Sequence, residues 1–398
     1  MINIQEVAKD TVWIGGSDRR LALFENLFPL PNGVSYNNYV VTDEKIVIFD
    51  TSDVSVADQY LENLKAVLAG RTPDYLVVLH MEPDHCSQIE NVLRLYPNLT
   101  IVTSLQASNM IRQFFPALTD AKFQLVKEGD VLNTGAHTFH FVAAPMVHWP
   151  EVLFAFDDCT KALFSADAFG TFGALDDSVF ADDYDFEKKY LDEARRYYAN
   201  IVGKFGMQVT NVLKKAAGLD IRAILPLHGP VWRKDLSFFL DKYEKWASYT
   251  PETDDILVVY GSLYGHTASA AEAFAAKLRR ETGKGVAVYD ASKTDVSYLI
   301  SEVWRCAKVV IFCPTYNGGI YPRIEGFLND MAALQVQNRT FALAENGTWG
   351  PVTAKLCRAK LETFKNCTVI PEVLTFKSAL HESDEEKLDA FVDAVARA

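Results

Sequence analysis

The sequence predicts an α/β protein of two domains, the second of which contains a doubly wound parallel sheet. Its 398 residues are more than one ordinary hydrophobic core accommodates. Residues 249–255 are polar and include a proline, which is typical of a linker. After this stretch, five strand-like apolar runs alternate with helical patterns, the order that produces a parallel sheet. We therefore expect domains at residues 1–250 and 254–398.

The composition is that of a soluble protein and argues against several classes of partner. A net charge of −13 disfavours binding to nucleic acid, which is a polyanion. No apolar run is long enough to span a bilayer, and the N-terminus lacks the apolar core of a signal peptide. The six cysteines are scattered without a C-x-x-C pair, which excludes a rubredoxin-type or zinc-ribbon site within this sequence. We expect a cytoplasmic protein that binds neither nucleic acid nor membranes.

In the first domain, residue types that bind metal ions follow strand-like apolar runs. Four of them fall within the six residues that come after the run at 75–79. Functional residues in α/β proteins gather at the ends of strands, so ligands after different strands are expected to converge on one rim. His80, Glu82 and Asp84 alternate along the chain, which suits an extended turn that points all three at one centre. The strand-like runs are 45–49, 75–79, 138–143, 162–165 and 223–227, and the candidate ligands are His80, Glu82, Asp84, His85, His148, Asp167 and His228.

The spacing of these ligands resembles a known superfamily. Metallo-β-lactamase-like proteins are αββα sandwiches with the signature H-x-H-x-D-H, and here Glu82 stands in place of the second histidine. A carboxylate makes the ligand set harder and more negative, which suits iron better than zinc. With His148, Asp167 and His228 at these intervals, the pattern is similar to that of flavodiiron proteins. A ferritin-like bundle is excluded, because the only E-x-x-H motif contains a proline and follows a strand.

The resemblance implies a role for each ligand. His80, Glu82 and His148 would hold one iron, Asp84, His85 and His228 the other, and Asp167 would bridge the two. In some relatives the residue that matches His85 does not reach its metal. The remaining histidines lack partners at ligand spacing. We expect His137, His140 and His381 to be structural or on the surface; the same expectation applies less to His266, which stands in a loop of the second domain considered below.

Three loops of the second domain favour a flavin. The strand-like run at 256–260 leads into a loop of small and hydroxyl residues before a helix, which suits a phosphate. This loop is neither a Walker A nor a G-x-G-x-x-G motif, so ATP and NAD are not favoured. It resembles the FMN-phosphate loop of flavodoxins, and the loops at 314–319 and 345–350 follow the third and fourth strands, where that fold holds the flavin ring. The expected FMN contacts are Ser262, Leu263, Tyr264, Gly265, His266, Thr267, Pro314, Thr315, Tyr316, Asn317, Gly318, Gly319, Asn346, Gly347, Thr348, Trp349 and Gly350.

Glu25, Tyr197 and Tyr198 are the candidate catalytic residues. Many family members have a histidine near the di-iron pocket where Glu25, or alternatively Phe24, stands here. Tyr197 or Tyr198 is expected to approach the pocket; the alternative is that these tyrosines lie on a helix surface and pack between the domains.

The resemblance implies an oxidoreductase that passes electrons from a donor protein through FMN to two iron ions, which reduce O2 to water and/or NO to N2O. It also implies a rubredoxin-like donor and a head-to-tail homodimer, or a dimer of dimers. One alternative is a zinc hydrolase of the metallo-β-lactamase superfamily with an attached flavodoxin module, against which Glu82 and Asp167 count. Another is an electron-transfer flavoprotein with a degenerate first domain, against which the complete ligand set counts.

Overall fold

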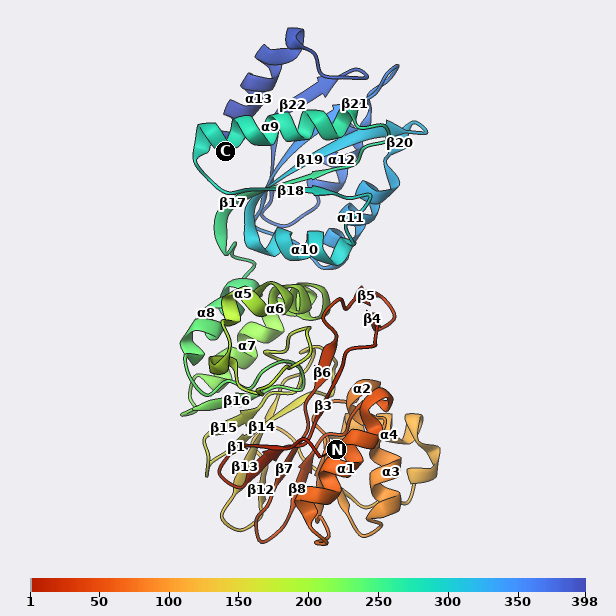
Figure 1. Ribbon diagram of the computed structural model, residues 1–398, viewed down its shortest axis with the longest axis vertical. Helices are drawn as coiled ribbons and strands as arrows, with labels where there is room; N and C mark the ends of the chain where they lie inside the picture. The colour runs from red at the N-terminus through yellow and green to blue at the C-terminus, as the bar shows by residue number, and fades with distance from the viewer. Residues whose placement is uncertain (1) are drawn as a thin grey trace. The chain divides into compact units, whose positions relative to one another are not determined.

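The computed structural model describes residues 2–398, which divide into two compact units (Figure 1). The first unit comprises residues 2–198 and Phe205–Glu244, and the second comprises Ala199–Lys204 and Lys245–Ala398. Residues 245–250 therefore pack with the second unit. The domain limits 1–250 and 254–398 stay predictions. No helix among residues 2–398 is both long and apolar enough to cross a membrane.

The first unit is built on two main sheets. In the seven-stranded sheet, β8 to β11 run parallel, whereas β1, β2 and β7 pair antiparallel. In spatial order its strands are β1 (Gln5–Ala8), β2 (Thr11–Trp13), β7 (Tyr39–Val41), β8 (Val47–Phe49), β9 (Tyr75–Val77), β10 (Thr100–Thr103) and β11 (Phe123–Leu125). The five-stranded sheet consists of β12 (Val131–Asn133), β13 (Thr138–Ala143), β14 (Leu153–Asp157), β15 (Ala162–Phe164) and β16 (Ala223–Leu225).

Helices and short strands complete this unit. Two two-stranded antiparallel sheets pair β3 (Gly16–Asp18) with β6 (Val34–Tyr36) and β4 (Leu23–Phe24) with β5 (Phe28–Pro29). The helices are α1 (Ala57–Leu68), α2 (Pro83–Cys86), α3 (Ile89–Leu95), α4 (Leu105–Phe114), α5 (Phe186–Lys189), α6 (Leu191–Tyr197), α7 (Gly206–Ala216) and α8 (Leu236–Ala247).

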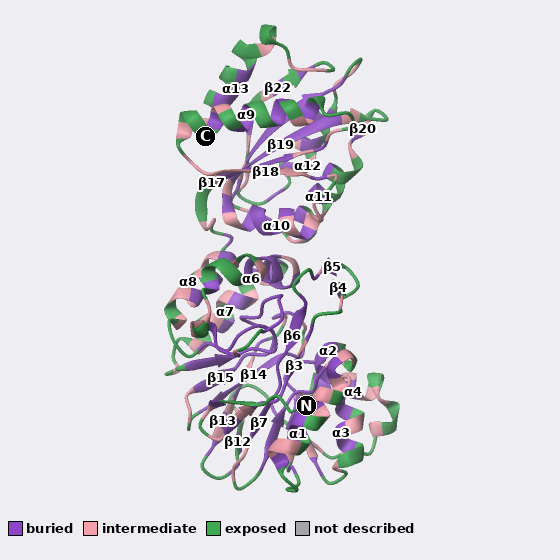
Figure 2. Cartoon of the chain, viewed as in Figure 1, coloured by how far each residue is buried: buried purple, intermediate pink, exposed green. Residues whose placement is uncertain are grey.

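The strands of the two sheets are largely buried (Figure 2), and most of the buried side chains are apolar. Tyr60, Leu64 and Leu68 recur every fourth residue of α1, so they share one face, which is buried against β8 and β9. From the other face of the seven-stranded sheet, the ring of Phe49 stacks on Phe164 of β15 with 3.9 Å between centroids. The result is the αββα sandwich that the sequence predicted.

The second unit contains a parallel sheet with helices on both faces. Its strand order, β18-β17-β19-β21-β22, is that of a flavodoxin-like doubly wound fold, which confirms the prediction. Phe274 of α9 and Phe391 of α13 pack against Phe312 in the core beneath one face. The strands are β17 (Thr253–Tyr260), β18 (Val286–Asp290), β19 (Cys306–Tyr316), β20 (Gly319–Ile320), β21 (Thr340–Asn346) and β22 (Thr368–Phe376), and the helices are α9 (His266–Thr282), α10 (Val296–Arg305), α11 (Pro322–Ala333), α12 (Thr353–Leu361) and α13 (Glu385–Arg397).

Two details differ from the expected elements. β17 begins at Thr253, because residues 253–255 of the expected linker extend the strand and Thr253 pairs with Cys306. β20 is a two-residue strand that folds back on the end of β19, and its Gly319 pairs with Tyr316.

Candidate functional site

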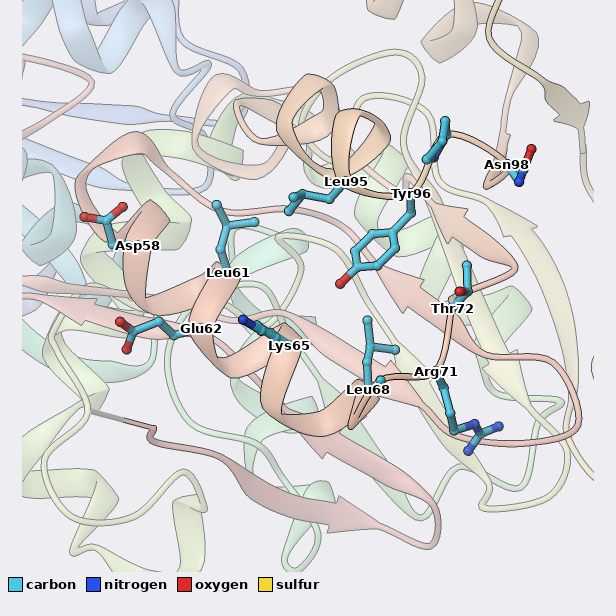
Figure 3. Close-up of a pocket in the computed structure, with 12 residues that line it drawn as sticks. Asp58, Leu61, Glu62, Lys65, Leu68, Arg71, Thr72, Leu95, Tyr96 and Asn98 are labelled. Atoms are coloured by element: carbon cyan, nitrogen blue, oxygen red, sulfur yellow. The ribbon is translucent and has the colours of Figure 1, made fainter.

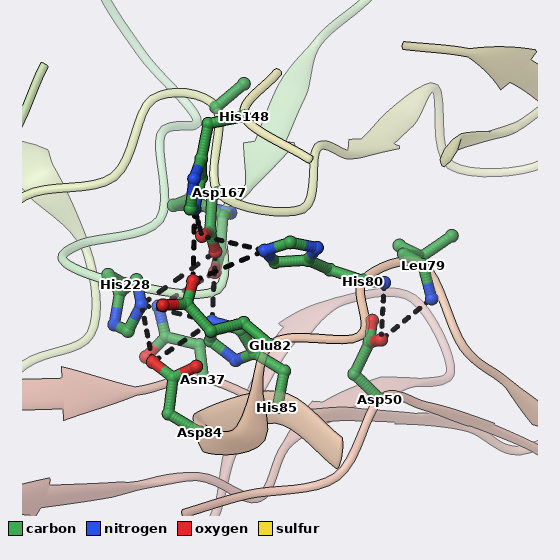
Figure 4. A network of polar contacts seen from close by, with 12 residues as sticks. Asn37, Asp50, Leu79, His80, Glu82, Asp84, His85, His148, Asp167 and His228 are labelled. Carbon is green, nitrogen blue, oxygen red and sulfur yellow. Dashed lines mark hydrogen bonds and ion pairs between the residues drawn. The ribbon is translucent and has the colours of Figure 1, made fainter. Parts of the chain in front are cut away.

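The seven predicted metal ligands lie together at strand ends of the first unit, and Figure 4 shows their side chains pointing toward one another. They follow β9, β13, β15 and β16, as the strand-end argument requires. None is more than 8% exposed. Their ligand atoms form two groups, each with all atoms within 4.8 Å of one another: His80, Glu82, His148 and Asp167 in one, and Asp84, His85 and His228 in the other.

The local backbone differs from the extended turn that we expected. The chain is extended only as far as Glu82, which is the N-cap of the one-turn helix α2. Pro83 occupies the first turn, where its missing N–H costs no hydrogen bond. Asp84 and His85 therefore project from a helix, and the expectation of a single extended turn was wrong for Asp84.

Asp167 lies between the two groups. Its Oδ2 is 3.4 Å from Nε2 of His80 and 3.1 Å from Nε2 of His148. Its Oδ1 is 3.0 Å from Nε2 of His85 and 3.8 Å from Nε2 of His228. Each carboxylate oxygen thus faces a different group, which is the arrangement that a carboxylate shared by two metal ions requires.

The protonation of the histidines and the unpaired oxygens fit a pair of cations. His228 donates from Nδ1 to the backbone oxygen of Ser35 at 2.8 Å, and a carbonyl oxygen can only accept. Its Nε2 therefore presents a lone pair to the centre. Both carboxylate oxygens of Asp84 and Oδ1 of Asp167 are buried and make no hydrogen bond among residues 2–398, although Oδ2 of Asp84 and Oδ1 of Asp167 lie 3.2 and 3.0 Å from ring nitrogens of the ligating histidines. Nitrogen and carboxylate lone pairs that converge in a buried pocket need positive charge, and this donor set suits iron.

The charges of the pocket are strongly coupled. Burial alone would lower the pKa of His85 and of His148, but the neighbouring carboxylates raise each to about 9. Burial alone would raise the pKa of Glu82, but hydrogen bonds with His148 and His80 hold it below its usual range. Protons and metal ions therefore compete for the same positions, so metal binding releases protons and strengthens as pH rises.

Two buried carboxylates that we did not predict support the ligands from behind. Glu151 Oε1 accepts from Nδ1 of His80 at 2.8 Å and from the backbone N–H of Met81 at 2.9 Å. Asp50 Oδ1 accepts from the backbone N–H groups of Leu79 and His80 at 2.8 and 3.3 Å. Asp50 follows a strand-like run, so the strand-end argument could have found it. Nothing in the sequence singles out Glu151.

The candidate catalytic residues lie at different distances from the centre. Glu25 lies on the turn between β4 and β5, and the residue as a whole is exposed. Its carboxyl group, however, is partly buried and forms a hydrogen bond with Glu82, and both effects raise its pKa to about 8. The ring centroids of Phe24 and Tyr197 lie 5.4 and 5.6 Å, respectively, from the ring centroid of His228. The hydroxyl of Tyr197 is buried and has no hydrogen-bond partner among the described residues.

Tyr198 and the other histidines lie outside the ligand groups. Tyr198 is buried against Tyr243, with 4.9 Å between ring centroids, and Tyr197 is fully buried as well. His137 and His140 form pairs with carboxylates. His266 opens α9 and His381 is the N-cap of the turn at Glu382–Asp384.

The predicted flavin loops enclose a cavity of about 150 Å³ in the second unit. Gly265, at φ +95°, lets the chain turn into α9, and Ser262 Oγ accepts from the N–H groups of Gly265 and Ala268. Asn346 donates to Thr267 at 3.2 Å, and its Oδ1 has no partner among the described residues. The residues that line the cavity are Ser262, Leu263, Tyr264, His266, Thr267, Pro314, Thr315, Asn346, Gly347 and Thr348, together with Ser378.

Seven of the expected flavin contacts do not line this cavity. Tyr264 and Trp349 are each 93% exposed, so both aromatic side chains are free to cover a bound ring. Ser378, which we did not predict, follows β22, the last strand of the sheet. The expected contacts outside the lining are Gly265, Tyr316, Asn317, Gly318, Gly319, Trp349 and Gly350.

A larger cavity of about 720 Å³ lies between α1 and the loop after α3 (Figure 3). Its lining is mostly exposed, and it mixes acidic Asp58 with basic Lys65 and Arg71. This groove is separate from the metal ligands and presents no set of groups with a common chemistry.

Comparisons with known proteins agree with both sites. Residues 34–229 match the family model described as ODP family beta lactamase, and residues 258–350 match the model described as Flavodoxin. The anaerobic nitric oxide reductase flavorubredoxin of Escherichia coli (strain UTI89) is 30% identical over 358 residues, which are 88% of this chain and 74% of that protein. The corresponding flavorubredoxin of Aeromonas hydrophila is 29% identical over 82% of this chain, which spans 66% of its length.

Two solved structures are similar along the whole chain. The rubredoxin oxygen:oxidoreductase of Desulfovibrio gigas has a TM-score of 0.92 and 26% identity, with 99% of this chain and 98% of that one covered. The flavodiiron protein of Giardia intestinalis has a TM-score of 0.93 and 25% identity, with 100% and 96% covered. The paired ligand groups, the flavin cavity and these relatives place the chain in the flavodiiron family, whose cofactors are FMN and a pair of iron ions.

Proposed function

We propose that this protein is an oxidoreductase in which FMN receives electrons from a donor protein and passes them to a di-iron centre that reduces O2 to water and/or NO to N2O. The single observation that carries the proposal is Asp167, whose two oxygens face two ligand groups in one buried pocket. Relatives named as nitric oxide reductase and as rubredoxin oxygen:oxidoreductase support this reaction class.

The metal roles follow from the two groups. His80, Glu82 and His148 would hold one iron, Asp84, His85 and His228 the other, and Asp167 both. A bound ferrous pair would supply two electrons, enough to convert two NO to N2O, and FMN would relay from the donor the two further electrons that reduction of O2 to water needs. The chain contributes burial, which keeps bulk water away, and a ligand set whose charge partly offsets that of the ions.

Two side chains are suited to handle the substrate or a proton. The hydroxyl of Tyr197 keeps its proton, because burial and the charges of nearby carboxylates raise its pKa well above 10.0. It can therefore donate a hydrogen bond to a small oxidant. Glu25, whose carboxyl group forms a hydrogen bond with Glu82, can hold a proton beside that ligand. Tyr198 lies behind Tyr197 against Tyr243, so we assign it a packing role.

We propose a rubredoxin-like or other separate protein as the electron donor, and a head-to-tail homodimer or a dimer of dimers as the assembly. The exposed Tyr264 and Trp349 beside the flavin cavity offer apolar surface for either contact. The zinc hydrolase alternative is disfavoured by the carboxylate of Glu82 and by the family of the chain.

To test this, iron-loaded protein and reduced rubredoxin, the electron donor, are prepared anaerobically. Either O2 or NO is then added, and the consumption of the two gases is measured in parallel. Loss of O2 without peroxide release would identify an oxidase that forms water, and loss of NO with N2O formed would identify an NO reductase. Inertness toward both gases, in protein that contains iron and FMN, would overturn the proposal.

A further inference from the structure

The two metal positions have matching inner ligands. Apart from Asp167, each group supplies two imidazoles and one carboxylate, and Asp167 turns one oxygen toward each side. The formal charge of the direct ligands is therefore the same for both ions. Any difference between the two irons has to come from groups beyond the direct ligands.

The groups behind the histidines are not the same on the two sides. Nδ1 of His80 is 2.8 Å from Oε1 of Glu151, a carboxylate that is 2% exposed. On the other side, Nδ1 of His228 donates to the uncharged backbone oxygen of Ser35. Nδ1 of His85 has no hydrogen-bond partner among the described residues.

Glu151 is held firmly in this position. Its Oε1 also accepts from the backbone N–H of Met81, and its backbone oxygen accepts from the hydroxyl of Ser104 at 3.2 Å. The carboxylate therefore fixes the His80 ring with its proton on Nδ1 and its lone pair on Nε2. A carboxylate behind a ligating imidazole also draws that proton toward itself, which makes the opposite nitrogen a stronger donor to the metal.

We propose that Glu151 is a positioning residue that makes the two irons unequal, so that the iron held by His80, Glu82 and His148 is bound more tightly and oxidised more readily than its neighbour. This inference rests on the proposed occupancy of the site by two irons. It assigns the inequality to one side chain outside the direct ligands.

Two other carboxyl groups near the ligands do not account for the asymmetry. Asp50 accepts from the backbone of His80, and its charge acts on His85 as well, so it influences both sides. The hydrogen bond of Glu25 with Glu82 acts on the same side as Glu151, but it draws electron density away from the ligand. Asp50 and Glu25 are the same in wild type and in a variant at Glu151 alone, so a comparison of the two proteins isolates the effect of Glu151.

The variant Glu151→Gln tests the inference because it keeps an oxygen acceptor but removes the charge. Asp157→Asn is the matched control, since Asp157 is also a buried carboxylate on Nδ1 of a histidine, His137, at 2.9 Å and outside the metal groups. Iron affinity is measured by anaerobic titration with Fe(II), FMN content by absorbance, and the two irons separately by Mössbauer spectroscopy of protein loaded with ⁵⁷Fe.

Glu151→Gln is expected to weaken the binding of one iron by about 10- to 100-fold and to shift one of the two Mössbauer doublets, with FMN content unchanged. Asp157→Asn is expected to leave both irons as in wild type. Unchanged affinity and two unchanged doublets in Glu151→Gln would overturn the inference, as would equal changes in both doublets.

A measurement on the wild-type chain keeps the inference testable if Glu151→Gln does not fold. In ¹⁵N-labelled protein loaded with Zn²⁺, the ring proton of His80 is expected on Nδ1 and far downfield, because it lies in a hydrogen bond to a carboxylate. A His80 ring without that proton would contradict the role of Glu151. These readouts do not depend on gas reduction, so they separate this inference from the proposed function.

Discussion

Replacement of Asp167 with alanine removes the one residue that faces both ligand groups. With two ferrous ions bound, the three carboxylates of the site leave a net charge of about +1, and Asp167→Ala raises it to about +2 in a buried pocket. Each ion also loses one oxygen ligand. Since loss of an outer partner alone costs about 10- to 100-fold in metal affinity, we expect at least about 100-fold here, or about 2.8 kcal/mol.

The assay loads the protein with Fe(II) anaerobically, removes free metal, and then measures iron, FMN and gas reduction on one sample. Asp167→Ala should lose iron and gas reduction but keep FMN, because the flavin cavity lies in the other unit. Asp157→Ala is the control for the loss of a fully buried carboxylate elsewhere in the same unit. Two retained irons with undiminished reduction in Asp167→Ala would refute the assignment of the bridge.

Three further predictions concern the flavin loop, a glycine and pH. Asn346→Ala should weaken FMN binding about tenfold with iron unchanged, as titration with FMN would show; equal affinity would exclude a contact. Gly229→Ala should destabilise the protein more than Gly70→Ala in urea denaturation. Both glycines have positive φ, which costs an alanine about 1–2 kcal/mol, but only at Gly229 would the new β-carbon also lie 2.1 Å from the methyl group of Thr171. Asp157→Asn should lower stability most between pH 3.8 and 6.5. The pKa of Asp157 is lowered, so its contribution is lost as pH falls below 3.8, and that of His137 is raised, so its contribution is lost as pH rises above 6.5; a pH-independent difference between variant and wild type would contradict this.

The sequence predicted the parts of the site that obey strand geometry. His148, Asp167 and His228 each follow a strand by a few residues, so their convergence could be inferred before any contact was known. Glu151 could not be found in this way, because it stands just before β14 rather than shortly after a strand, and its contact with His80 depends on how the two sheets pack. Ser378 follows β22 and was within reach of the same argument as the ligands.

Short backbone features were the least predictable. The single turn of α2 begins at Pro83 and is closed by backbone hydrogen bonds from Cys86 to Glu82 and from Ser87 to Pro83, and no periodic pattern exists in four residues. The tight turn that carries Glu25 has φ +51° at that residue, a conformation that neither composition nor spacing indicates. Nothing in the sequence indicated that the carboxyl group of Glu25 forms a hydrogen bond with Glu82.

The ligands of the metal site are divided between the two sheets of the first unit. His80, Glu82, Asp84 and His85 follow β9 of the seven-stranded sheet, whereas the remaining ligands follow strands of the five-stranded sheet. A pair of ions bound here is therefore also a cross-link between the two layers of the sandwich, and it joins ligands such as Glu82 and His148, 66 residues apart, and His85 and His228, 143 residues apart. The metal centre can assemble only after both layers have formed. Loss of the ions would remove this link between the two sheets, as reduction of a disulfide removes a covalent cross-link.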